Sequence, residues 1–326
     1  MKPGKISQTV YRRSVLKQLN TDVHAAFFPP AKEECCYGIK ADPGEMILSS
    51  GVSLYGNEKD LCVFAIAQVC NALATRGASP KGVSIQIMLP EFAYESRLKA
   101  MMQTSSEAAK EYGIEILAAD VQNVPGIKTT IVNVTAVGTT KRILQSCKAP
   151  AGQDIVQIKW IGLEGTLRIL KARQESLAKH FPSAFLKQTV SYEKELISLK
   201  EMKAADAIGV SAMHQIGDGG ILAALWELAE GADIGLSVDM RRIPVKQETI
   251  EVCEYFHLNP YQLTSTGSIL VITPKGEELA DTLTREGMAA AVIGHTTAGR
   301  ERIILNQGEI RYIDRPAPDE LTKILI

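Results

Sequence analysis

Apolar residues along this chain recur at two spacings, one typical of helices and one typical of strands, which together predict a mixed α/β fold. In the first half the pattern predicts strands at 46–51, 83–89, 114–119 and 129–138, and helices at 7–19, 61–76 and 94–112. In the second half it predicts strands at 155–161, 207–212, 268–273 and 289–294, helices at 166–180, 192–205, 249–256 and 276–286, and a hairpin at 302–313. The second half thus repeats the layout of the first.

The most informative single stretch is the glycine-rich run from Gly217 to Gly220, with Asp218 inside it. It lies between the apolar segment 207–212 and a predicted helix that begins at Ile221. Glycines let the backbone approach a ligand closely, and the free N–H groups of a first helical turn suit a phosphate or a carboxylate. Many α/β turns carry glycines only to make the bend, so the turn by itself leaves both interpretations open.

The length of 326 residues allows two domains of ordinary size. A short stretch with proline and glycine at 148–153 is the best candidate for the boundary, which gives domains at 1–148 and 149–326. A formal net charge of -1 offers no general attraction for nucleic acid or an anionic membrane. No signal peptide and no run of 18 apolar residues is found, so we expect a cytoplasmic protein.

The six cysteines show no spacing typical of a zinc site, and we expect them to be free thiols. The adjacent pair Cys35 and Cys36 could be redox-active or bind a soft metal, but a chance pair in a loop explains it as well. Cys253 lies in a predicted helix and is interpreted as a core residue. Of the five histidines only His214 lies next to the glycine-rich turn, where it is a candidate functional residue.

Several segments, in their order and spacing, resemble the superfamily of aminoimidazole ribonucleotide (AIR) synthase, formylglycinamidine synthase, selenophosphate synthetase, thiamine monophosphate kinase and the hydrogenase maturation protein HypE. The resemblance covers about residues 40 to 300 and is closest to the HypE branch. The segments that carry it are Asn71, 73–74, 77–80, 113–120, 154–156, 161–165, 219–220, 224–229, Gly235, 243–244, 248–249, Cys253, 259–260 and 264–270.

This resemblance implies an N-terminal α/β domain that pairs with its copy in a homodimer, followed by a second α/β domain. It also implies an ATP site in which aspartates hold Mg²⁺ on the phosphates, used to activate a carbonyl or amide oxygen as a phosphate ester. Carried onto this chain, the implied metal ligands are Asp120 and Asp218, which with His214 are the candidate catalytic residues. The implied nucleotide-binding residues are Asn71, Gly217, Gly219 and Gly220.

The chain departs from the family pattern where carboxylates are expected. Ser50, Ala72 and Gln215 stand at three positions where the family usually has aspartate, and Ala119 replaces the usual glycine. Alanine cannot coordinate a metal, and glutamine compensates the charge of Mg²⁺ far less than a carboxylate does. The HypE branch also ends in a reactive cysteine, whereas this sequence ends in Ile326. We therefore expect a magnesium site that is weakened or absent.

Two hypotheses remain. The first is a divergent ATP-dependent enzyme of the superfamily that activates an oxygen of an unidentified substrate. The second is a non-catalytic relative, either a dimeric scaffold or a sensor that binds a nucleotide or another ligand without turnover. Asp218 can equally be a residue that caps the helix or forms the turn. Neither the substrate nor a partner protein can be named from the sequence.

Overall fold

The computed structural model describes residues 4–5, 8–19, 39 and 41–325. The chain forms two compact units, and we describe each by itself. The first unit contains residues 1–73 and 78–142, and the second contains residues 74–77 and 143–326. None of the helices that the structure describes combines the length and apolar character needed to cross a membrane.

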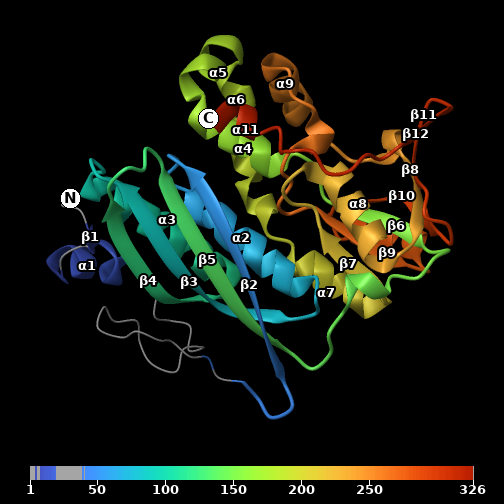
Figure 1. The fold of residues 1–326 in the computed structure, drawn as a ribbon, viewed down its shortest axis with the longest axis horizontal. Helices are drawn as coiled ribbons and strands as arrows, with labels where there is room; N and C mark the ends of the chain where they lie inside the picture. The colour runs from blue at the N-terminus through green and yellow to red at the C-terminus, as the bar shows by residue number, and fades with distance from the viewer. Residues whose placement is uncertain (1–3, 6–7, 20–38, 40, 326) are drawn as a thin grey trace. The chain divides into compact units, whose positions relative to one another are not determined.

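The first unit is built on a five-stranded sheet with the order β1-β4-β3-β5-β2 (Figure 1). Strands β3 and β4 are parallel, and the other neighbours are antiparallel. The strands are β1 (Gly4–Lys5), β2 (Met46–Gly56), β3 (Ser79–Pro90), β4 (Glu115–Val124) and β5 (Thr130–Thr140), and the helices are α1 (Gln8–Ser14), α2 (Leu61–Ala74) and α3 (Glu95–Tyr112).

Burial alternates along β5, as expected for a strand with one covered face. Val132, Val134 and Ala136 are fully buried, and ten of the residues of α2 are buried as well. Ile131 and Val137, on the opposite face of β5, are only half-buried. The sheet of the first unit therefore has one face covered by the core and one face that is more open.

The second unit is built on a seven-stranded sheet with the order β12-β11-β8-β10-β6-β9-β7. Only β8 and β11 are parallel. The strands are β6 (Asp154–Ile158), β7 (Ala212–Gln215), β8 (Gly235–Asp239), β9 (Ile269–Thr273), β10 (Ala290–Thr297), β11 (Arg302–Asn306) and β12 (Glu309–Tyr312). The helices are α4 (Leu163–Ala172), α5 (Gln174–His180), α6 (Ser183–Val190), α7 (Leu199–Ile208), α8 (Gly220–Ala232), α9 (Gln247–Phe256), α10 (Gly276–Arg285) and α11 (Thr322–Leu325).

Both faces of this second sheet are covered. Ile155 and Leu270 pack in one apolar cluster with residues of α8, whereas their neighbours Val156 and Val271 pack in another cluster with residues of α7 and α10. A strand that is buried on both faces has a nearly continuous run of apolar residues, as β9 does. Residues of β7 and α8 pack in these clusters, which positions the glycine-rich turn that connects the two elements.

The predicted elements are mostly confirmed, but several predictions were wrong in detail. The strand predicted at 46–51 continues to Gly56, and the helix predicted at 7–19 is α1 followed by a 3-10 helix at Leu16–Gln18. Residues 207–208 end helix α7, and the strand before the glycine turn is β7 at Ala212–Gln215. The predicted helix 166–180 is two helices that meet at Arg173. The predicted helix 192–205 is a 3-10 helix at Ser191–Leu196 followed by α7. Strand β4 continues through Asp120 to Val124 instead of ending there.

Candidate functional site

The glycine-rich turn joins β7 to α8 and requires glycine at two adjacent positions. Gly219 and Gly220 both have left-handed backbones, with φ of 76° and 66°. A Cβ on Gly220 would lie 2.5 Å from the carbonyl oxygen of Tyr261 and 2.8 Å from the backbone nitrogen of Leu263. Because only glycine combines this conformation with this close approach, the turn is explained by local packing whether or not it binds a ligand.

The backbone N–H of Gly219, at the N-terminus of α8, already bonds to a carboxyl group supplied by the chain itself. It donates a hydrogen bond of 2.7 Å to Oδ2 of Asp319, and the N–H of Leu321 donates one of 2.8 Å to Oδ1 of the same side chain. Asp319 is 3% exposed. The sequence predicts that the Gly219 amide binds a ligand phosphate. In the structure this amide bonds instead to the carboxyl of Asp319, one hundred residues later in the chain.

The environment of Asp319 is unusual for an aspartate. Burial raises the pKa of its carboxyl to about 7, although the hydrogen bonds from Leu321 and Gly219 act in the opposite direction. The negative charges of Asp218 and Glu164 raise the pKa further. Glu164 is itself buried, 3.6 Å from the guanidinium of Arg168, and accepts a hydrogen bond of 3.0 Å from Thr264. The glycine turn is therefore bordered by acidic groups.

The structure places His214 in β7 and pairs it with the surface carboxylate of Glu227 on α8, 3.2 Å from its Nε2. Asp218 is exposed at the tip of the turn, and the carbonyl of Gly217 accepts a hydrogen bond of 3.1 Å from the N–H of Gly220. These residues and Gly219 all belong to the second unit.

The other predicted site residues lie in the first unit. Asp120 is exposed in the middle of β4, where it is paired in register with Gln86 of β3. Asn71 is fully buried within α2. Within the described residues, no three histidine, cysteine, aspartate or glutamate side chains gather as ligands for a metal ion.

The donor set near the turn suits a neutral or hydrogen-bonding group better than a tightly held Mg²⁺. Gln215 stands where the resemblance implies an aspartate, and its Oε1 is buried without a hydrogen-bond partner among the described residues. A buried acceptor without a donor is costly and would gain from a ligand hydroxyl or amine. The neutral side-chain oxygen of Gln215 also compensates the charge of a divalent cation less than a carboxylate would.

Of the four cysteines that the structure reports as free thiols, three are buried and Cys147 is exposed. Cys62, Cys70 and Cys253 are buried, and burial raises the pKa of each thiol to about 12. The prediction that Cys253 is a helical core residue is confirmed. Cys35 and Cys36 lie outside the described residues.

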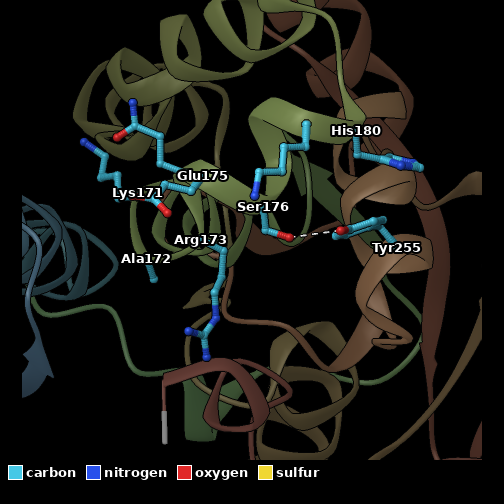
Figure 2. A pocket seen from close by; sticks show the side chains of 9 residues that line it. Lys171, Ala172, Arg173, Glu175, Ser176, His180 and Tyr255 are labelled. Atoms are coloured by element: carbon cyan, nitrogen blue, oxygen red, sulfur yellow. Dashed lines mark hydrogen bonds between the residues drawn. The ribbon is translucent and has the colours of Figure 1, made fainter.

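A wide surface hollow of about 700 Å³ opens beside α5 (Figure 2). It is lined by several basic residues, and two of them, Lys171 and Arg173, have partners outside the hollow. The ammonium of Lys171 is 2.6 Å from Glu193, and Arg173 donates a hydrogen bond of 2.6 Å to the carbonyl of Ile324. Ser176 and Tyr255 bond to each other at 2.9 Å. The basic side chains do not converge on a common point, so the hollow is not a second candidate site.

A smaller cavity of about 230 Å³ lies next to the glycine turn. It is lined by Gly219 and Ala223 of the turn and helix α8, by Tyr261, and by the chain from Arg311 to Ala317. The C-terminal part of the chain therefore forms one wall of the space beside the turn.

The fold and the turn define a two-domain α/β protein, and comparison with known families agrees with this class. Residues 46–140 match the family "AIR synthase related protein, N-terminal domain", and residues 150–306 match "AIR synthase related protein, C-terminal domain". The chain belongs to the AIR synthase-related family.

Within this family the chain is similar to hydrogenase maturation proteins. It is 25% identical to a provisionally named hydrogenase expression/formation protein of Methanocaldococcus jannaschii, over 98% of this chain and 97% of that protein. It is also 25% identical to the carbamoyl dehydratase HypE of Rhodobacter capsulatus, over 81% of this chain and 79% of that protein.

Solved structures show the same fold. A crystal structure of HypE from E. coli matches with a TM-score of 0.77 at 20% identity, over 98% of this chain and all of that chain (100%). A structure of HypE in complex with ATP matches with a TM-score of 0.75 at 18% identity, over 96% of this chain and 95% of that chain. The predicted resemblance to the AIR synthase superfamily, near HypE, is confirmed.

Proposed function

We propose that this protein binds ATP and that the glycine turn of the second unit contributes to the phosphate site. The observation that carries the proposal is the hydrogen bond from the Gly219 amide to the carboxyl of Asp319, because an amide that donates to a carboxyl oxygen can donate to a phosphate oxygen in its place. The ATP complex of a similar HypE supports the choice of ligand. The orphaned Oε1 of Gln215 adds an acceptor near the turn that is suited to a ligand hydroxyl or amine.

The proposed chemistry is the ATP-dependent activation of a carbonyl or amide oxygen. A similar protein is named carbamoyl dehydratase, which is a reaction of this type. In the second unit, Gly217, Gly219 and Gly220 would bind phosphate, and Asp218 and His214 would act in the reaction. For Asn71 and Asp120 of the first unit we keep the roles that the resemblance implies, nucleotide binding and metal binding with catalysis. Because Ser50, Ala72 and Gln215 supply no negative charge, any metal assistance would depend on Asp120 and Asp218 alone.

Calorimetric titration with ATP, with and without Mg²⁺, tests this function. We expect binding in the micromolar range that Mg²⁺ improves less than tenfold, together with slow phosphate release. Asp120→Ala and Asp218→Ala are expected to remove the effect of Mg²⁺, because each deletes one remaining anionic ligand. Asp281→Ala, an exposed aspartate on α10, is the matched control and should bind like the unmodified protein. Absence of ATP binding under both conditions would refute the proposal.

The alternative is a non-catalytic homodimeric scaffold or ligand sensor, and the lack of a carboxylate at Ser50, Ala72 and Gln215 favours it. Under either hypothesis, two copies of the protein would form the homodimer through the more open face of the sheet in the first unit. Ile131 and Tyr55 border a hollow of about 390 Å³ there, and Tyr55 is 39% exposed. ATP binding without any phosphate release would support the sensor over the enzyme.

Ile131→Lys is expected to weaken a homodimer at least tenfold, because it places a charge on this open face beside the hollow. Light scattering or sedimentation over a range of protein concentrations would measure the change. Phe92→Lys is the control, since Phe92 is 86% exposed and lies in the loop between β3 and α3. Equal effects of both substitutions, or no dimer in the unmodified protein, would contradict pairing through the sheet.

A further inference from the structure

The cavity of about 230 Å³ beside α8 has walls that hydrogen bonds hold in place. On one side lies Tyr261, whose backbone N–H donates a hydrogen bond of 3.1 Å to Oδ1 of Asn259. On the other side lie residues 311–317, which are fastened by the backbone hydrogen bond of Ile313 and by the side chain of Asp319. The space is therefore preformed, as most small-molecule sites are.

Much of the lining of this cavity is apolar. Leu222 and Ala223 of α8 contribute to it, together with Met240 and Ile304. Ala223 is only 2% exposed, yet it does not belong to the apolar cluster that packs α8 against the sheet, so its methyl group borders the cavity instead. Walls of this kind gain dispersion contacts from an apolar ligand and give up no hydrogen bond to it.

Aromatic and sulfur-containing side chains also line the cavity. Tyr261 and Tyr312 border it, and Tyr312 is 63% exposed, so a large part of its ring is accessible. Burial raises the pKa of the Tyr261 phenol, which therefore remains a neutral hydroxyl donor at neutral pH. The thioether of Met240 makes favourable contacts with aromatic rings. These groups suit a planar ring that stacks on or packs against them.

The charged groups around the cavity have both signs. Arg311 lines it and is 2.9 Å from the carboxylate of Glu309. Arg315 follows directly after Asp314 in the lining, and the exposed Asp218 lies on the neighbouring glycine turn. Because these charges oppose one another, the cavity does not select a phosphate or another strongly charged ligand. The planar guanidinium groups can still stack on the face of a ring.

The size of the cavity limits the ligand. An apolar cavity of about 150 Å³ is large enough to bind benzene. The larger volume here, about 230 Å³, therefore has room for a ring system of about ten non-hydrogen atoms. A fused pair of small rings has this size, whereas a whole nucleotide does not fit.

We propose that this cavity binds an uncharged, planar heteroaromatic ring, which packs against Met240 and Tyr261 and on the methyl group of Ala223. Two sources supply such a ring: the base of a nucleotide, and a free ring compound. The inference goes beyond the proposed function, because the cavity needs neither Mg²⁺ nor the Gly219 amide to hold its ligand.

The test is a titration of the full chain with adenine, indole, ATP and inorganic pyrophosphate, followed by NMR of isotope-labelled methionine methyl groups. The Met240 resonance is assigned with Met240→Leu. Adenine and indole are expected to shift this resonance, and pyrophosphate is not. Met202 and Met213 are internal controls that should not shift, because they are buried in the cluster on the other face of the sheet.

Two substitutions in the same helix test where the rings bind. Ala223→Leu is expected to weaken the binding of adenine and indole by at least about tenfold, because the larger side chain occupies the cavity. Ala232→Leu adds the same atoms at the end of α8, outside the lining of the cavity, and should bind both rings like the unmodified protein. Unfolding in urea checks that both variants are folded.

The outcomes separate this inference from the proposed function. If Ala223→Leu weakens ATP as much as adenine, the ring is the base of the nucleotide. If it weakens the free rings but not ATP, the cavity takes a separate ring compound, and the inference stands in both cases. If the rings bind and ATP does not, the inference stands and the ATP function fails.

The inference is wrong, whatever the result with ATP, if neither ring shifts the Met240 resonance or if both rings bind equally to Ala223→Leu and Ala232→Leu. The comparison of Met240 with Met202 and Met213 needs no substitution in the cavity wall at α8. It therefore remains decisive if Ala223→Leu is unstable.

Discussion

Gly220→Ala is expected to destabilise the second unit by about 3 kcal/mol, the sum of a left-handed backbone penalty and overpacking. Gly220 has φ of 66°, which an alanine adopts only with strain. Its new Cβ would also lie 2.5 Å from the carbonyl oxygen of Tyr261 and 2.8 Å from the nitrogen of Leu263. Both are backbone atoms of a loop held by its own hydrogen bonds, so neither can rotate away.

Gly231→Ala in the same helix is the matched control for this substitution. Gly231 lies inside α8, is exposed, and has no atom within 4 Å of its Cβ position. Alanine there should stabilise the helix by about 0.5–1 kcal/mol. Both tryptophans, Trp160 and Trp226, belong to the second unit, so tryptophan fluorescence during urea unfolding reports on that unit. A shift of the same sign for both variants would contradict the packing argument.

The sequence predicted well those elements whose own residues decide their structure. Strand β5 alternates buried and half-buried residues from Thr130 to Val137, and the strand was expected at 129–138. Helix α8 has apolar residues at helical spacing and was also expected. The short apolar run 207–212 was assigned wrongly because periodicity cannot separate a short strand from the end of a buried helix. Gly209, with φ of 109°, ends α7 in the middle of that run.

The candidate site was predicted only where its residues are consecutive. The glycine turn itself is local, and its two left-handed glycines follow from a sharp bend between β7 and α8. Asp319 was missed because its bond to Gly219 spans one hundred residues and leaves no periodic signal. A local sign existed, since an aspartate before a short apolar stretch is typical of a residue that caps a helix. This local pattern predicts that Asp319 caps a helix at 321–325, but it does not predict a contact between Asp319 and the glycine turn.

Raising the pH from 5 to 7 is expected to destabilise the unmodified protein by about 2–3 kcal/mol relative to Asp319→Asn, at 1.36 kcal/mol per unit of pKa difference. The folded protein holds the proton of Asp319 up to a pKa of about 7, whereas the unfolded chain releases it at its ordinary value of 3.8. Between these values the unfolded state binds fewer protons than the folded state, so stability falls as the pH rises. Above the folded pKa both states are ionised, and no further loss is expected from this group.

The measurement is the free energy of unfolding in urea from pH 4.5 to 8.5 for the unmodified protein, Asp319→Asn and Asp314→Asn. Taking differences between the curves cancels the titration of all other groups. The curve for Asp314→Asn, in which an exposed aspartate is changed, should run parallel to that of the unmodified protein. The curve for Asp319→Asn should lack the decline below pH 7, because asparagine does not titrate. If all three curves stay parallel, Asp319 is ionised throughout this range, and the acidic surroundings of the glycine turn do not oppose its docked carboxylate.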